Sequence, residues 1–214
     1  MRQSGFSLIE LVVAVAVAGV LLSLGLSSFQ TMMASTNTKT VSESVLSGLR
    51  RARAEAIKRN APMRFQLVST LDATCVLSPT SQLWLVTQTN QGTGGFTYGR
   101  PAGLCGTAPA IPPDFCTAGV CQNLPYIAFT SSATVLRNIT IAAVNAVAAN
   151  TSVVTFGPLG QILGNVEGST SIARVNVSST VAGAKAWQVN VSAANGAIKL
   201  CDPALAAGQP LACS

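Results

Sequence analysis

The chain begins with a short polar segment followed by a long apolar run, and this pairing constrains the fold more than any other feature. Residues 1–5 carry one basic side chain, Arg2, and residues 6–29 carry one charge, Glu10, in a largely apolar stretch. As an α-helix, a run of this length would reach about 36 Å, which is enough to cross the hydrocarbon core of a bilayer. We therefore expect residues 6–29 to form a transmembrane helix.

Glu10 is unusual in such a helix, because an ionisable side chain in a membrane segment costs about 2.5 kcal/mol or more. An ordinary secretory signal also has a shorter apolar middle, of about 7–15 residues, and a small-residue cleavage site behind it. Both oddities are explained if a peptidase cuts between Gly5 and Phe6 on the cytoplasmic side. The new amine of Phe6 is then a cation at the start of a retained helix, and Glu10 can pair with that amine in a neighbouring subunit.

The stretch from Gly5 to Leu11, Gly-Phe-Ser-Leu-Ile-Glu-Leu, resembles the processing signature of type IV pilins and type II secretion pseudopilins. The resemblance implies that a prepilin peptidase removes residues 1–5 and methylates Phe6, and that Glu10 supports docking between subunits. The implied partners are other pilins or pseudopilins. The implied location is the inner membrane, single-pass with a periplasmic head, and afterwards a pilus or pseudopilus.

The helix is expected to continue beyond the apolar run, because residues 30–60 contain no proline. Apolar side chains recur there at helical spacing and lie on one face: Val41, Val45, Leu49, Ala52 and Ala56. The pattern predicts an amphipathic second half over residues 30–61 that packs on a head domain. The Asn-Ala-Pro sequence that ends at Pro62 predicts the stop, since proline disfavours helix in the residue before it.

The head domain, residues 62–214, is expected to be rich in β-strands. Short apolar or alternating segments are separated by Gly, Asn and Ser turns, and no second helical pattern occurs. The expected strands cover residues 63–68, 82–87, 126–130, 134–141, 152–156, 171–177, 186–191 and 197–200. The predicted fold class is therefore α+β, with a long N-terminal helix packed on an antiparallel β-sheet or β-sandwich.

The six cysteines are expected to form disulfides, since the periplasm is oxidising. Cys201 and Cys213 would close a loop of 13 residues at the C-terminus, and this favoured pair resembles the cysteine-closed C-terminal loop of many pilins. The sequence does not choose among the pairings of the other four, which are Cys75, Cys105, Cys116 and Cys121.

The sequence offers little for catalysis or metal binding. It has no histidine and seven acidic side chains, and it lacks a phosphate-binding loop, a dinucleotide motif and a nucleophile elbow. The cysteine spacings match no zinc-ligand pattern. We expect no enzymatic activity, no catalytic residue, no metal and no cofactor.

DNA binding is an alternative, because cations gather near the end of the long helix. They are Arg50, Arg51, Arg53, Lys58, Arg59 and Arg64. No aromatic side chain is interleaved to stack on bases, so a solvated helix face is the simpler interpretation. Residues 52–60 also resemble the end of the long helix in FimT and H-type pseudopilins.

Some FimT-type proteins bind DNA through a Gly-Arg-x-Arg stretch near the C-terminus. The corresponding residues here run from Gly196 to Lys199 and read Gly-Ala-Ile-Lys. The first arginine is missing, and Lys199 stands for the second as a point charge without the bidentate fork of arginine. This departure weakens the case for DNA uptake.

The resemblance implies a minor pilin or pseudopilin of the FimT and H-type group, which primes a filament or lies near its tip. The sequence does not distinguish a type IV pilus from a type II secretion pseudopilus. A further alternative is a secreted soluble β-domain, released by ordinary signal peptidase near Ser27 or Ala34.

Overall fold

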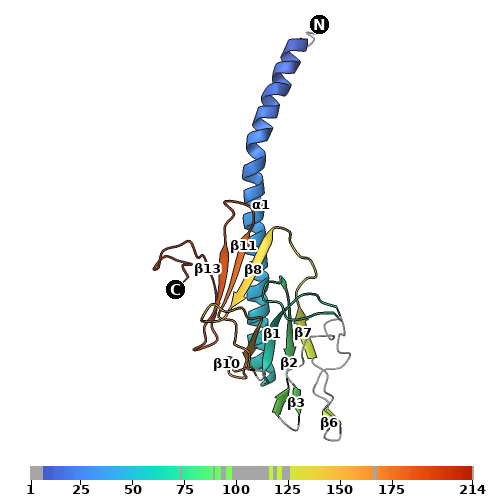
Figure 1. The fold of residues 1–214 in the computed structure, drawn as a ribbon, viewed down its shortest axis with the longest axis vertical. Coiled ribbons are helices and arrows are strands. Elements are labelled where there is room, and N and C mark those ends of the chain that lie inside the picture. The colour runs from blue at the N-terminus through green and yellow to red at the C-terminus, as the bar shows by residue number, and fades with distance from the viewer. Residues whose placement is uncertain are drawn as a thin grey trace.

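The fold is seen in a computed structural model of the chain. It describes residues 7–72, 74–88, 90–92, 95–97, 116–117, 120–121, 126–165 and 168–213. One long helix, α1 (Leu8–Arg59), precedes a head of β-strands, and the N-terminal half of the helix projects beyond that head (Figure 1). At 52 residues, α1 is about 78 Å long.

The helix ends where proline predicts it. Asn60 adopts the left-handed conformation with φ 48°, and its N–H donates to the carbonyls of Ala56 and Ile57. This cap satisfies carbonyls of the last turn that have no partner within the helix. The predicted stop before Pro62 is confirmed.

The larger of the two main sheets has five strands in the order β10-β9-β1-β2-β7, and all neighbours are antiparallel. Its strands are β1 (Met63–Val68), β2 (Leu83–Gln88), β7 (Tyr126–Thr130), β9 (Val153–Phe156) and β10 (Ile162–Leu163). The central strand, β1, is buried along its whole length.

The second main sheet has four antiparallel strands in the order β13-β12-β11-β8. They are β8 (Ile139–Val144), β11 (Arg174–Ser179), β12 (Trp187–Val191) and β13 (Ile198–Cys201). Two small hairpins complete the described strands: β3 (Asn90–Gly92) with β4 (Gly95–Thr97), and β5 (Cys116–Thr117) with β6 (Val120–Cys121).

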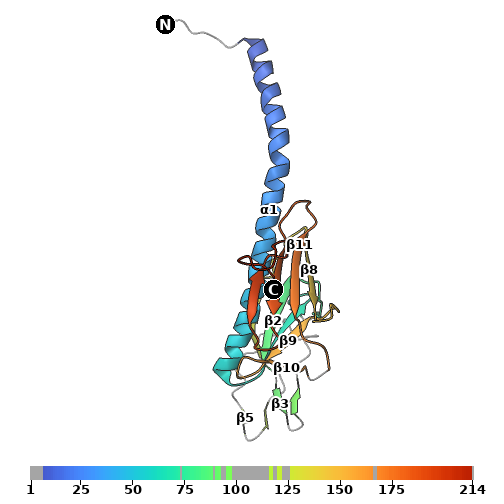
Figure 2. The ribbon, with the colours of Figure 1, turned by 90° about the vertical axis from the view of Figure 1, so that its left-hand side faces the viewer.

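A single core joins the helix to both sheets. Every residue of the predicted apolar stripe is buried, from Val41 to Ala56. Inward-facing side chains of β1, β2 and β9 meet those of β8, β11, β12 and β13 around this stripe. Figure 2 shows α1 running along one side of the head, so the stripe predicted from helical spacing is the surface that holds the two sheets together.

A hydroxyl stripe continues the buried face of α1 toward the projecting half. Thr38 and Ser42 are fully buried, and the Thr38 hydroxyl donates to the carbonyl of Lys185 at 2.6 Å. The Ser35 hydroxyl accepts from the N–H of Lys185 at 3.0 Å. The loop between β11 and β12 therefore holds the helix through side-chain hydrogen bonds, one turn after another, at the point where α1 leaves the head.

The expected strand over residues 134–141 is wrong in its position, because β8 begins only at Ile139. Asn138 has a positive φ of 61°, which breaks an extended strand. The Gln82 side chain bonds the N–H and carbonyl of Leu136 and the carbonyl of Ile139, at 2.8 to 3.2 Å. A distant glutamine thus satisfies the backbone of a loop that the local pattern assigns to a strand.

Gly48 allows the helix to approach the five-stranded sheet closely. A Cβ at this position would lie 2.7 Å from the Trp84 ring and 2.8 Å from the Phe65 ring. Both rings are buried, and their centroids are 5.7 Å apart. The Trp84 indole N–H also donates to the Ser44 hydroxyl at 3.1 Å, which fixes that ring.

We predict that Gly48→Ala destabilises the head by up to about 2 kcal/mol, because an overpacking cost of about 1–3 kcal/mol against two fixed rings is partly offset by a gain of about 1 kcal/mol in helix propensity. Urea unfolding followed by tryptophan fluorescence measures the change. Gly164→Ala is the control, since a Cβ there meets nothing within 4 Å. An unchanged midpoint for Gly48→Ala would mean that the rings move aside easily.

Candidate functional site

The projecting part of α1 exposes apolar side chains around its circumference. They are 53% to 82% exposed and comprise Leu8, Ile9, Leu11, Val12, Val13, Val15 and Val17. Glu10 is the one charge among them and is itself exposed. An apolar surface of this extent is typical of a site that contacts another protein or lipid.

Two predicted features of the N-terminus lie outside the described residues: the cleavage position after Gly5 and the methylated residue, Phe6. Among the residues that the structure does describe, no helical segment has the length and apolarity needed to cross a membrane. The transmembrane role of residues 6–29, the processing site and the docking role of Glu10 stay predictions.

Arg53, one of the candidate DNA contacts, is committed to the fold. Its Nε donates to the carbonyl of Gly160 at 3.0 Å, and its Nη2 donates to the carbonyl of Asn195 at 3.1 Å. These carbonyls belong to two loops, one after β9 and one between β12 and β13. Arg53 thus connects the helix to a loop of each sheet.

The cations at the end of the helix surround a partly buried carboxylate, Glu55. Arg59 donates to Glu55 at 2.6 Å, and the Lys58 ammonium lies 3.6 Å from it. The hydrogen bond from Arg59 is the main reason that the pKa of Glu55 is lowered, while burial opposes this shift. Arg64 is buried in β1.

Arg50 and Arg51 are exposed, and both line a shallow depression of about 380 Å³ along the helix. Lys199 is exposed on β13. The structure therefore does not present the predicted cations as one basic surface, because the side chains of Arg53, Arg59 and Arg64 are directed to intramolecular contacts or buried. Arg50, Arg51 and Lys58 are the predicted cations of the helix end that stay exposed, and DNA binding there stays an alternative.

Gly196, which resembles the glycine of the FimT-type motif, has a structural role here. A Cβ on Gly196 would lie 2.1 Å from the carbonyl oxygen of Gly160, the atom that Arg53 binds. Gly196 also has a positive φ of 64°, a conformation that favours glycine. The position is therefore fixed by the close approach of two loops.

We predict that Gly196→Ala destabilises the head by about 3 kcal/mol or more, because backbone must move to relieve the clash. Gly183→Ala is a matched control. Its φ of 76° imposes similar strain, but its Cβ would lie 3.6 Å from Thr31, which is ordinary contact. Urea unfolding of both variants separates the effect of the clash from that of the backbone strain. Equal losses of unfolding free energy in the two variants would show that the clash has no effect.

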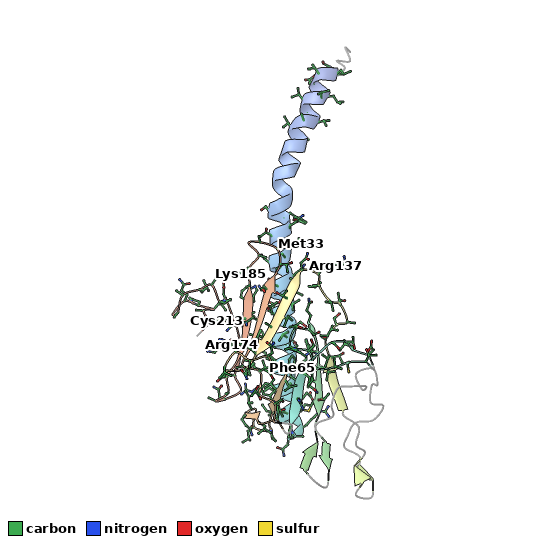
Figure 3. The ribbon with its side chains drawn as sticks, viewed as in Figure 1. Met33, Phe65, Arg137, Arg174, Lys185 and Cys213 are labelled. Carbon is green, nitrogen blue, oxygen red and sulfur yellow. A yellow bond between two sulfur atoms is a disulfide. The ribbon has the colours of Figure 1, made fainter. Side chains whose placement is uncertain are left out.

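The C-terminal segment is held at the edge of the four-stranded sheet by a disulfide between Cys201 and Cys213, with an S–S distance of 2.03 Å. This is the pair that the sequence favours. The backbone of Asp202 forms an isolated β-bridge with Ala212, and its carboxylate forms a 2.8 Å ion pair with Lys185. Lys185 lies near the end of the head from which α1 projects (Figure 3). Its ammonium is 4.5 Å from the centre of the Trp187 ring. The same lysine thus connects the C-terminal loop, the second sheet and, through its backbone, α1.

Cys75 is buried and disulfide-bonded, and the described part of the chain contains no free cysteine. Cys116 and Cys121 are register partners across the hairpin of β5 and β6. Cys105 lies outside the described residues. The pairing among Cys75, Cys105, Cys116 and Cys121 stays open.

Hydrogen bonds from Lys185 and from the N–H of Ala204 hold the pKa of Asp202 below its ordinary value of 3.8. Ionised Asp202 therefore stabilises the fold at pH values above that ordinary pKa. This contribution is lost as the pH falls through the lowered pKa of the folded state.

We predict that Asp202→Asn lowers the free energy of unfolding by about 1 kcal/mol at pH 7, because a charge-assisted hydrogen bond to a half-exposed lysine is lost. The difference from the parent should shrink below about pH 3.8, where the unfolded-state carboxylate protonates. Denaturation at several pH values measures it. Glu43→Gln, at an exposed pair 3.9 Å from Lys39, should change little. A pH-independent difference would contradict the role of the Asp202 charge.

Within the described residues, no group of three or more His, Cys, Asp or Glu side chains is arranged to hold a metal ion. The depression lined by Arg50 and Arg51 is open and shallow. The features that stand out for function are therefore surfaces: the apolar projection of α1 with Glu10, and polar faces of the head.

A long helix projecting from an antiparallel β-head defines a pilin-like architecture. Residues 1–26 match the prokaryotic N-terminal methylation motif, which accords with this class. Residues 41–196 match the family of the type II transport protein GspH. Because this match spans most of the chain, the protein belongs to the GspH family.

Two crystal structures of the type IV minor pilin FimU from Pseudomonas aeruginosa are similar to this chain. One is 12% identical with a TM-score of 0.39, over 77% of this chain and 88% of that chain. The other, in a different crystal form, is 13% identical with a TM-score of 0.37, over 76% of this chain and 90% of that chain. The comparison with curated proteins gives no match.

Proposed function

We propose that this protein is a minor pilin or pseudopilin that assembles into a type IV pilus or a type II secretion pseudopilus. Before assembly, α1 anchors it in the inner membrane with the head in the periplasm. A prepilin peptidase cuts after Gly5, and Phe6 becomes the methylated N-terminus. The role is structural, without catalysis.

One observation carries this proposal: the first turns of α1 expose their apolar side chains, whereas the head covers the apolar stripe of the second half. Side chains from Leu8 to Val17 are exposed, whereas those from Val41 to Ala56 on the stripe are buried. An apolar helix without a covering layer needs lipid or other helices around it. A filament subunit meets both environments, first the membrane and then neighbouring copies of the same kind of helix.

Glu10 is the charged side chain of the projecting half. It lies in the first turn of α1, among exposed apolar side chains. Transfer into an apolar filament core is costly for a carboxylate unless a cation neutralises it. The amine of Phe6 in an adjoining subunit provides that cation in the proposed assembly. Priming of assembly or a place near the tip is part of the proposal through the resemblance to the FimT and H-type group alone.

The experiment that tests this function begins with intact mass. In cells with an active prepilin peptidase, the purified protein should lack residues 1–5 and carry one methyl group on Phe6. An N-terminus near Ser27 or Ala34 would instead support the secreted soluble domain. Retention of residues 1–5 would exclude processing as proposed.

We predict that Glu10→Val reduces incorporation into filaments by about tenfold or more, because the docking ion pair is lost. Co-purification with sheared filaments or with the other subunits measures incorporation. Glu43→Val is the control, since Glu43 is an exposed carboxylate on the head-packed half of the same helix. Both variants should still lose residues 1–5. Equal incorporation of Glu10→Val and the parent would rule out electrostatic docking.

A further inference from the structure

We propose that the outer face of the four-stranded sheet binds a carboxylate from a neighbouring filament subunit. The site is a row of three side chains, Arg174, Asn190 and Lys199, which we call the donor row. This inference rests on the proposed function, because the carboxylate belongs to another subunit of the assembly.

The register of the strands builds the donor row. Arg174 on β11 is the partner of Asn190 on β12, and Asn190 is the partner of Lys199 on β13. Neighbouring strands are about 4.8 Å apart, and register partners present their side chains on the same face. The three residues line one open depression of about 400 Å³.

The donor row offers hydrogen-bond donors toward this depression. The Asn190 side-chain oxygen already accepts from Nε2 of Gln188, so its amide nitrogen remains as a donor. The guanidinium of Arg174 and the ammonium of Lys199 carry donors and no acceptor. A group that satisfies all three must supply acceptors, and an anion does so best.

The two cations of the donor row have no counter-ion in the described part of the chain. Neither the side chain of Arg174 nor that of Lys199 forms an ion pair or a hydrogen bond there, although Arg174 is half-buried. The depression has no carboxylate in its lining, and Asp202, on the same strand end as Lys199, is already paired with Lys185. Charge complementarity therefore calls for an anion from outside the molecule.

A single protein carboxylate fits the donor row better than a polyanion. The outer face beyond the row is neutral, with Asn176 and Ser178 following Arg174 on β11 and Gln188 preceding Asn190 on β12. Binding of a nucleic acid requires several cations along its backbone. The other labelled arginine, Arg137, lies on the opposite flank of the head from Arg174 in Figure 3.

The position of the row suits contact between subunits. Strands β8, β11 and β13 run beside α1 (Figure 1), so their outer face is a lateral face of the head. In a filament whose helices pack side by side, lateral faces of successive heads come together. An Asp or Glu of the adjoining head or helix is then the occupant of the donor row.

Zero-length carbodiimide coupling tests this inference on the full-length chain, in membranes of cells that contain the other filament subunits. The reagent joins an amine to a carboxylate in direct contact, and peptide mapping identifies both residues. We expect an isopeptide bond between Nζ of Lys199 and an Asp or Glu of another pilin-like subunit. Lys199→Arg should abolish this bond, because arginine keeps the charge without a primary amine.

Arg174→Gln should lower the yield of the Lys199 adduct about fivefold, since one charge-assisted contact of about 1 kcal/mol is lost. Coupling of Lys185 to Asp202 within the chain, across their 2.8 Å ion pair, is the internal standard. Its unchanged yield shows that each variant is folded and that the reagent acted.

Three outcomes would overturn the inference. The first is the absence of a Lys199 adduct in membranes where the chain co-purifies with other subunits, which leaves the proposed function intact. The second is a Lys199 adduct that forms with the same yield in the Arg174→Gln variant as in the parent. The third is salt-sensitive binding of a short double-stranded DNA that both Arg174→Gln and Lys199→Ala remove, which would assign the row to phosphate. Failure of the parent chain to co-purify with any subunit would remove the proposed function and this inference together.

Discussion

The packing of one helical stripe against two sheets is the interaction on which the rest of the structure depends. The four-stranded and five-stranded sheets share no strand, and the side chains of α1 from Val41 to Ala56 close the core between them. Contacts at both ends reinforce this core: the Lys185 loop binds the hydroxyls of Ser35 and Thr38, and Arg53 binds a loop of each sheet. The direction of the projecting half is therefore fixed by the head, and this matters for a subunit that has to present its helix to others.

The same packing directs some of the cations at the end of α1 to partners within the chain. The chain has a net charge of +6, so it has more cations than carboxylates. Which groups these cations bind depends on where hydrogen-bond acceptors lie. Arg53 reaches carbonyls more than one hundred residues away in sequence, and Arg59 binds a carboxylate one turn away. Cations that bind backbone carbonyls or a buried carboxylate add to stability and cannot also bind a ligand. Lys199 of the donor row is among the cations that stay exposed, and Arg174 is half-buried.

The sequence allows the helix, its stop and its buried face to be predicted because these depend on local spacing and on proline. Most strands follow from the same local patterns, whereas β8 is displaced because Gln82 satisfies a loop far along the chain. The role of Gly196 and the donor row were not predictable, since both depend on register and on loop approach between distant segments. A hint of the hydroxyl stripe exists in the sequence, because Thr31, Ser35, Thr38 and Ser42 continue the helical spacing of the apolar residues. The spacing of the apolar residues alone does not reveal it.

The distribution of satisfied and unsatisfied charges separates structure from recognition in this protein. Asp202 and Glu55 have cationic partners within the chain, and both carboxylates are buried or nearly so. Glu10, Arg174 and Lys199 have no ion-pair partner among the described residues, and in the proposed assembly a neighbouring subunit covers them. Burial of such a charge in an assembly is costly when the neighbour is wrong and favourable when it supplies the opposite charge. In the proposed assembly, apolar contact along α1 supplies adhesion without much discrimination, and selectivity for the correct neighbour and register comes from these charges.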